Sequence, residues 1–262
     1  MDLEHRVTFH AWSEPALIAW ARLGFELLAG LNTVVVRESH PQWIQLKTLI
    51  AETDCFDFIT AVFDAHEIDS AETLAMRPAW HHGYPQPESD FGYLDATYDL
   101  RAYCPHCGGG ASQRAPFRMK SEPKWGRRSI LQLNWVFDQY FVTLQLWETV
   151  FKPFGIGSCE VLAARTQQPL STVVQLVVPE IVDLEIPDVS GEQCNACNRV
   201  RYLPIEADFF PRPMPVNAPM FRSRQSFGSG ASSWNLVLCT QAMRQALVAA
   251  GVKGVDFEPC QQ

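Results

Sequence analysis

The hydrophobic pattern of residues 1–95 predicts a small α/β unit. Short β-branched and aromatic clusters predict strands, and longer stretches with apolar residues at helical spacing predict helices between them. Trp43, Leu46, Leu49 and Ile50 show this helical spacing. The strands are expected at Val7–His10, Thr33–Val36 and Phe56–Phe63, and the helices at Ala16–Leu28 and Pro41–Ala51.

Polar and helix-breaking residues indicate where these elements begin and end. Ser13 is a good N-cap for the first helix, and Gly30 is a natural stop after it. Ser70 is expected to cap a short helix that continues to Met76. Residues 77–95 are rich in proline and glycine, which predicts an irregular connector to the rest of the chain.

From residue 96 onward, the pattern predicts a second domain (96–262) with a weak internal repeat. Each half begins with a CxxC turn and continues through a helix, a glycine and a short strand, with threonine as the helix N-cap. We therefore expect two half-modules, related by an approximate twofold, that each contribute one cysteine pair. The helices are expected after Thr143 and Thr240, over Leu144–Lys152 and Gln241–Ala250, and the strands over Ser158–Leu162 and Gly254–Phe257.

The strongest strand signal of the chain lies between the two halves. Apart from Gln175, residues 172–178 are β-branched or apolar on both faces, which predicts a central strand of a sheet. The alternation over Val182–Ile186 predicts a further strand that pairs with a neighbour.

Two cysteine pairs are the clearest chemical motif. Cys104 and Cys107 occur in the sequence CPHC, and Cys194 and Cys197 occur in CNAC. Two thiols separated by two residues can bind one metal ion from a single turn, and two such turns supply the four thiolates of a closed zinc site. The 86 residues from 108 to 193 separate the pairs. We predict one structural zinc ion, because four thiolates leave no coordination position for a catalytic water.

Two other uses of these thiols stay open at this point. The CPHC sequence also occurs in thioredoxin-like oxidants, but that chemistry needs a helix that starts at the first cysteine, and Gly108, Gly109 and Gly110 disfavour a helix. The thiols could also be buried without a ligand. The cysteines without paired spacing are expected to be core or near-surface thiols: Cys55, Cys159, Cys239 and Cys260.

Composition and charge narrow the class of protein. Of the 262 residues, 47% are hydrophobic, which predicts a folded chain. The formal charge of −8 favours a basic partner over a nucleic acid. The N-terminus lacks the pattern of a secretory signal, and no stretch of about 18 apolar residues predicts a membrane span. We therefore expect a cytoplasmic protein with no membrane partner and with reduced thiols.

One basic segment, residues 118–128, supports an alternative function. Basic residues interleaved with an aromatic residue can bind RNA, single-stranded DNA or an acidic protein. The competing interpretation is a solvated loop whose tryptophan anchors it to the core. A nucleic-acid-associated zinc protein is therefore the second hypothesis. The candidate partner-binding residues are Arg118, Lys120, Lys124, Trp125, Arg127 and Arg128.

Evidence for catalysis is sparse in the sequence. His81 and His82 in the predicted connector could bind a metal or act in catalysis, but a packed connector is the favoured interpretation because the sequence places no third ligand beside them. The chain has no Gly-rich phosphate loop and no nucleophile elbow. Catalytic residues are therefore not assigned, and a non-enzymatic protein is favoured over an enzyme.

Residues 100–260 resemble the double-CxxC immunity-like proteins of bacterial polymorphic toxin systems. The resemblance rests on CPHCG from Cys104, on the strand that ends in Gln175 and Leu176 before the second cysteine pair, and on GVKGVDF from Gly251. Asn198 departs from the pattern, which usually has glycine there. The resemblance implies a cytoplasmic protein that neutralises a cognate toxin by binding it.

Taken together, these patterns predict an α+β fold. A small N-terminal α/β unit (1–95) is expected first, followed by an α+β domain made of two halves. A zinc-ribbon-like site of four cysteines is expected to hold the two halves together. The expected function is a non-enzymatic, zinc-stabilised protein-binding module.

Overall fold

The computed structural model describes residues 1–11, 14–186 and 191–262, and its helices and many strands confirm the α+β class. The described residues form two compact units. The N-terminal unit contains Met1–Glu67 and Ile205–Phe209, and the main unit contains Ile68–Pro204 and Phe210–Gln262. The sequence instead suggested a division near residue 95. The N-cap predicted at Ser13 lies outside the described residues.

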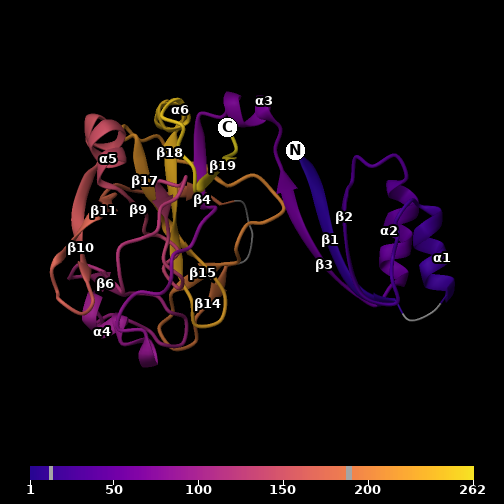
Figure 1. Cartoon of the computed structure of the whole chain (residues 1–262), viewed down its shortest axis with the longest axis horizontal. Helices are drawn as coiled ribbons and strands as arrows, with labels where there is room; N and C mark the ends of the chain where they lie inside the picture. The colour runs from indigo at the N-terminus through magenta and orange to yellow at the C-terminus, as the bar shows by residue number, and fades with distance from the viewer. Residues whose placement is uncertain (12–13, 187–190) are drawn as a thin grey trace. The chain divides into compact units, whose positions relative to one another are not determined.

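The N-terminal unit has an antiparallel sheet with the strand order β2-β1-β3, and two helices accompany it (Figure 1). Val7 of β1, Trp20 of α1 and Leu46 of α2 meet in one buried cluster. These elements confirm the predicted strands and helices, but α1 ends at Arg22, before the predicted end, because Gly24 takes a left-handed conformation (φ 88°). The elements are β1 (Asp2–Ala11), α1 (Glu14–Arg22), β2 (Gly30–Arg37), α2 (Trp43–Glu52) and β3 (Cys55–Val62).

The main unit is built on a first-half sheet, with the strand order β7-β10-β11-β9-β8, and a second-half sheet, with the order β14-β15-β17-β18-β4-β19. The first-half strands are β7 (Arg118–Met119), β8 (Ile130–Leu131), β9 (Phe141–Thr143), β10 (Gly157–Ala163) and β11 (Pro169–Val177). The second-half strands are β4 (Thr73–Pro78), β12 (Ile181–Val182, beside β17), β14 (Glu192–Gln193), β15 (Val200–Tyr202), β17 (Met220–Phe227), β18 (Trp234–Thr240) and β19 (Val255–Pro259).

Short helices and two small strand pairs complete the main unit. Within the described residues, no helix has the length and apolar character needed to cross a membrane. The small strand pairs are β5 (Tyr98–Asp99) with β6 (Ser112–Gln113), and β13 (Leu184–Glu185) with β16 (Arg212–Pro213). The helical segments are α3 (Ala65–Ser70, shared with the N-terminal unit), η1 (Ser89–Phe91), α4 (Tyr93–Thr97), α5 (Leu144–Leu146), η2 (Trp147–Phe151), η3 (Lys152–Phe154) and α6 (Gln241–Ala249).

Both sheets of the main unit contain the same split β-α-β motif. In the first-half sheet, β9 leads through α5, η2 and η3 into β10, and β11 lies between β9 and β10, antiparallel to both. In the second-half sheet, β18 leads through α6 into β19, and β4 lies between them, antiparallel to both (Figure 1). The predicted helix and strand of each half therefore occupy equivalent places in their sheets. The inserted strand differs in chain order, because β11 follows its motif and β4 precedes its motif.

The predicted threonine caps begin both helices of the repeat. Thr143 Oγ1 accepts a hydrogen bond from Leu146 N at 3.2 Å, and Thr240 Oγ1 accepts one from Met243 N at 3.4 Å. Each bond satisfies an amide that has no partner inside the helix. These local predictions are confirmed because a cap depends only on residues that are neighbours in the sequence.

The inserted strand β4 corrects one prediction. The sequence favours a helix from Ser70 to Met76, but α3 ends at Ser70 and Thr73–Pro78 forms a strand. The helix prediction was wrong because it relied on the intrinsic helix propensity of Leu74 and Met76, which does not take the neighbouring strands into account. Between β18 and β19, Leu74 is 0% and Met76 is 5% exposed, so pairing and burial in the sheet override that propensity.

The two split motifs share one hydrophobic core. Leu74 of β4, Leu247 of α6, Phe151 of η2 and Leu176 of β11 all belong to it. On the other face of the first-half sheet, Val173 of β11 joins a second cluster. The prediction that this strand lies centrally and is buried on both faces is therefore confirmed.

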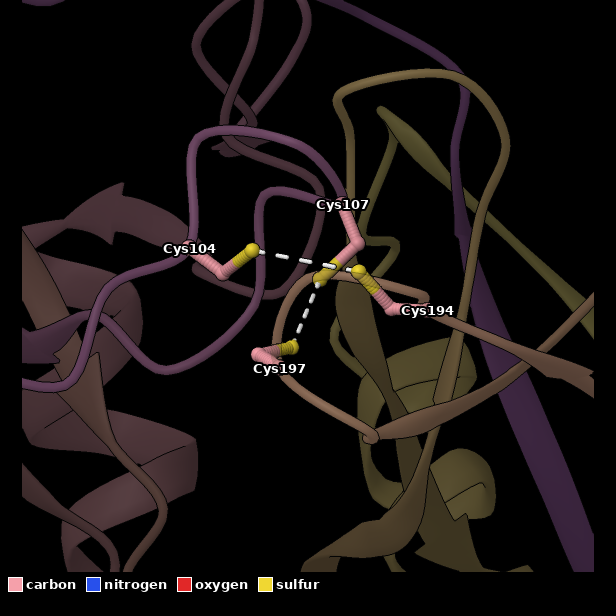
Figure 2. Close-up of side chains that lie close together, drawn as sticks. All are labelled: Cys104, Cys107, Cys194 and Cys197. Carbon is pink, nitrogen blue, oxygen red and sulfur yellow. Dashed lines mark hydrogen bonds between the residues drawn. The ribbon is translucent and has the colours of Figure 1, made fainter.

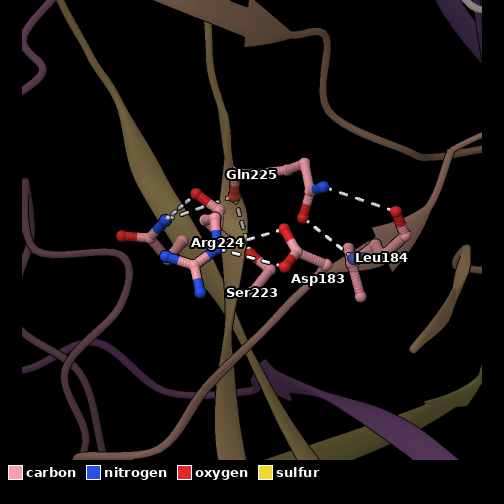
Figure 3. Close-up of polar contacts among 6 residues, drawn as sticks. Asp183, Leu184, Ser223, Arg224 and Gln225 are labelled. Carbon is pink, nitrogen blue, oxygen red and sulfur yellow. Dashed lines mark hydrogen bonds and ion pairs between the residues drawn. The ribbon is translucent and has the colours of Figure 1, made fainter. Parts of the chain in front are cut away.

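A bulge in β17, formed by Ser223, Arg224 and Gln225, holds the segment that contains β12 and β13 (Figure 3). Arg224 Nε donates to both carboxylate oxygens of Asp183, at 3.1 and 3.2 Å. Gln225 Oε1 accepts from Leu184 N at 2.9 Å, and Gln225 Nε2 donates to Leu184 O at 3.3 Å. The bulge interrupts the regular alternation of side chains along β17, so that Arg224 and Gln225 can bond to the segment with Asp183 and Leu184.

Shortening a core side chain of β4 tests the inserted strand. Leu74→Ala should destabilise the main unit by about 2–5 kcal/mol, because it leaves a cavity in the shared core. Urea denaturation followed by tryptophan fluorescence measures this change. Leu203→Ala is the matched control, since Leu203 lies in the same unit and is 68% exposed. Equal effects of the two substitutions would contradict the placement of β4.

Candidate metal centre

The two predicted cysteine pairs meet in the main unit and face one another (Figure 2). Cys104 Sγ lies 3.9 Å from Cys194 Sγ, Cys107 Sγ lies 3.6 Å from Cys197 Sγ, and all four sulfurs lie within 4.8 Å of one another. A zinc ion with Zn–S bonds of about 2.3 Å needs sulfurs about 3.8 Å apart in a tetrahedron. A disulfide needs about 2.05 Å. The arrangement therefore fits one tetrahedral metal ion.

Both cysteine loops have the same backbone hydrogen bonds. Gly108 N donates to Cys104 O, and Asn198 N donates to Cys194 O, each at 2.8 Å. A second bond, from the amide of the first cysteine to the carbonyl five residues later, measures 2.9 Å in both loops. The strand pairs β5–β6 and β14–β15 close the loops. Because the geometry is repeated, each loop presents two thiols to the shared centre.

The residue after each motif is left-handed, with φ of 75° at Gly108 and 61° at Asn198. Asparagine tolerates this conformation better than most residues, which explains how the second loop forms without a glycine at this position. A Cβ added at Gly108 would also lie 2.4 Å from Ala231 O. The first loop therefore requires glycine for space as well as for backbone conformation.

The backbone of the loops prepares the first cysteine of each pair for metal binding. The N–H of Cys107 lowers the pKa of the Cys104 thiol to about 7, and the N–H of Ala196 lowers the pKa of the Cys194 thiol. Burial raises the pKa of the Cys107 thiol to about 11. Ionisation of the Cys107 thiol beside the others therefore needs a nearby cation, as metal ligation provides.

Two arginines that follow the second cysteine pair hold the first loop. Arg199 Nη2 donates to Ala102 O at 2.8 Å. Arg201 is 7% exposed, and its Nη1 donates to Cys107 O at 3.2 Å. The same Nη1 also donates to Gly230 O at 2.6 Å and to Ser232 O at 3.0 Å. Sequence reasoning missed this role, since an arginine beside a motif does not reveal which distant carbonyls it reaches.

A buried glutamine ties the first cysteine loop to the first-half sheet. Gln175 of β11 is 2% exposed and exchanges side-chain hydrogen bonds with Gln113 of β6, at 2.9 and 2.7 Å. Gln175 Nε2 also donates to Gln139 Oε1 at 2.9 Å. The second loop is tied to the second-half sheet by pairing of β15 with β17. The cysteine cluster therefore links the two halves of the main unit.

The basic segment is partly engaged inside the main unit. Arg118 lies in β7, and its Nε donates to Gln167 Oε1 at 2.8 Å. Trp125 Nε1 donates to Thr172 Oγ1 at 3.3 Å, and the Trp125 ring lies 5.7 Å from that of Trp80. These contacts favour the anchored-loop interpretation, and the partner-binding role of the segment stays a prediction. The exposed basic side chains are Lys120, Lys124, Arg127 and Arg128.

The two adjacent histidines are not assembled with other metal ligands. Among the described residues, the group of potential metal ligands contains the four cysteines and neither His81 nor His82. His82 N donates to Gln132 O at 2.9 Å, and the His82 ring lies 5.7 Å from that of Trp80. Burial lowers the pKa of both imidazoles. A catalytic role for this pair stays a hypothesis.

The cysteines without paired spacing lie outside the cluster. Cys239 and Cys260 are buried, and burial raises the pKa of Cys239 to about 12. Cys159 is half-buried and donates to Gln175 Oε1 at 3.3 Å, and Cys55 is half-buried in β3. These positions agree with the expected core and near-surface thiols.

No known family model, curated protein or solved structure matches this chain. The functional interpretation therefore depends on the geometry of the site and on the motifs of the sequence.

Metal analysis of the purified protein tests the four-cysteine site. We expect about one zinc ion per chain, and Cys104→Ser or Cys194→Ser should each abolish that stoichiometry because three thiolates from the two loops no longer close the tetrahedron. Cys55→Ser, in the N-terminal unit, is the matched control and should retain the metal. A full zinc complement in the Cys194→Ser protein would refute a shared site.

Paired substitutions test the different demands of the two loops. Gly108→Ala should destabilise the main unit by about 1–3 kcal/mol, because alanine is strained at this φ and its Cβ meets Ala231 O. Asn198→Gly should change the stability by less than about 0.5 kcal/mol. Thermal denaturation of the two zinc-loaded variants measures the difference. An equal loss of stability in both variants would show that the loops do not differ in this way.

Proposed function

We propose that this chain is a non-enzymatic, zinc-stabilised protein-binding module, and that it is an immunity protein that neutralises a cognate toxin by binding it. The closed four-cysteine cluster is the observation that carries the proposal. Its ligands come from loops separated by 86 residues, 108 to 193, and a tetrahedral ion there has no open position for a substrate. The metal ion would therefore stabilise the fold that carries the binding surface and would not take part in catalysis.

Zinc is the metal that best suits this donor set. Thiolates are soft ligands that select zinc over magnesium and calcium, which prefer oxygen. The sulfur separations of 3.6 and 3.9 Å match the edge of a zinc–thiolate tetrahedron. We infer that Cys104, Cys107, Cys194 and Cys197 are its ligands.

The immunity role is supported by the motif order and by charge. Both CxxC motifs and the C-terminal stretch occur in the order that resembles the double-CxxC immunity-like proteins. The formal charge of −8 favours electrostatic steering toward a basic partner, and a cytoplasmic location would place the two proteins together before the toxin acts. Trp125, the aromatic residue of the basic segment, is held by internal contacts, which disfavours the nucleic-acid alternative.

Co-expression with the products of adjacent genes tests this function. We expect one of them to inhibit growth when expressed alone, to be tolerated with this chain, and to co-purify with it. The Cys194→Ser variant should protect poorly, since loss of the metal loosens the linked halves. The Cys55→Ser variant should protect fully. Absence of both rescue and co-purification for every neighbouring product would count against an immunity function.

A further inference from the structure

An aromatic pocket lies beside the first cysteine loop in the main unit. It has a volume of about 730 Å³, and the backbone of residues 108–111 forms part of its wall. The Phe91 ring lies 4.7 Å from that of Trp135, and the Phe137 ring lies 4.8 Å from that of Trp234. Phe91 is 53% and Phe137 is 39% exposed. The pocket therefore presents aromatic surface directly to solvent.

The backbone is strained where it shapes this pocket. Asp90, Phe91 and Trp135 all line it and have positive φ angles of 51°, 54° and 67°. In the described part of the chain, the other non-glycine residues with positive φ are Gln167 and Asn198. Bulky aromatic residues are uncommon in this region, and such strain concentrates at functional sites. The fold therefore tolerates an unfavourable backbone conformation that holds the Phe91 and Trp135 rings in place.

The charge of the pocket has one sign. Of the described residues that line it, none is lysine, arginine or histidine, and two, Asp90 and Asp138, are acidic. Burial raises the pKa of Asp138, so the exposed Asp90 is the main source of negative charge. Arg222, which lowers the pKa of Asp138 against the larger effect of burial, lines the neighbouring cavity. Aromatic faces attract cations, and a carboxylate beside them strengthens this preference. The lining therefore complements a cationic group.

We propose that this pocket receives an arginine side chain presented by the protein partner, an assignment that rests on the proposed binding function. A guanidinium group is planar, so it stacks on exposed aromatic rings such as those of Phe91 and Phe137 while its N–H groups reach a carboxylate. A basic partner also matches the net charge of −8. Buried aromatic residues and arginines carry most of the binding energy in many protein interfaces.

Titration with N-acetyl-arginine amide tests the pocket without the partner. Two-dimensional NMR of the tryptophan indole N–H groups should show saturable shifts for Trp135 and Trp234, and none for Trp20 in the N-terminal unit. N-acetyl-citrulline amide, the uncharged isostere, should bind roughly tenfold more weakly because it lacks the cation. Phe91→Leu and Asp90→Asn should each weaken arginine binding, whereas Phe56→Leu and Asp95→Asn, both at exposed positions outside the pocket, should not.

Equal binding of the arginine and citrulline amides, or no binding of either, would overturn the proposal. A second experiment measures binding of the neighbouring gene product that co-purifies with the unaltered chain. Phe91→Leu should weaken that complex roughly tenfold or more, and Phe56→Leu should leave it unchanged. An unaffected Phe91→Leu complex would overturn this pocket while the immunity function stands. Binding of the arginine amide with no protein partner captured would overturn the assignment to a partner and leave a pocket for a free organic cation.

Discussion

Four thiols of the main unit must converge on one point from loops that are far apart in the sequence. Closing a loop of the 86 residues from 108 to 193 costs about 4 kcal/mol of chain entropy. Structural zinc sites in small peptides supply roughly 10–16 kcal/mol, more than this cost and similar to the whole stability of a typical domain. A metal ion at the cluster is therefore strong enough to decide whether the two halves stay together, and the arginines and Gln175 direct how they meet.

Local chemistry made much of this structure predictable. The CxxC spacing, the threonine caps before both helices of the repeat and the apolar strand before Val178 all depend on neighbours in the sequence. The four-cysteine group followed from the same reasoning. By contrast, β4 could not be predicted, because Leu74 and Met76 favour a helix until β18 and β19 flank them. The carbonyls that Arg199 and Arg201 reach are likewise set by the fold. The aromatic pocket could not be predicted from the sequence, because Asp90, Phe91 and Trp135 share no motif and come together only in the fold.

The pocket and the metal centre share part of one loop. Residues 108–111 contribute backbone to the wall of the pocket, and Gly108 directly follows a cysteine of the cluster. The conformation that aims the thiols therefore also shapes a surface on which a partner can bind. Under the proposed function, a metal ion at the cluster would influence recognition through this shared loop without touching the partner itself.

The position of β4 has a consequence for how the chain folds during its synthesis. The 155 residues from 79 to 233 separate this strand from β18. Until β18 and β19 leave the ribosome, a strand with apolar residues on both faces has no permanent neighbours in its sheet. Non-local pairing of this kind slows folding and leaves unpaired strand edges open to aggregation. The first-half sheet can form early in synthesis, whereas the second-half sheet can form only after β18 and β19 are synthesised, long after β4.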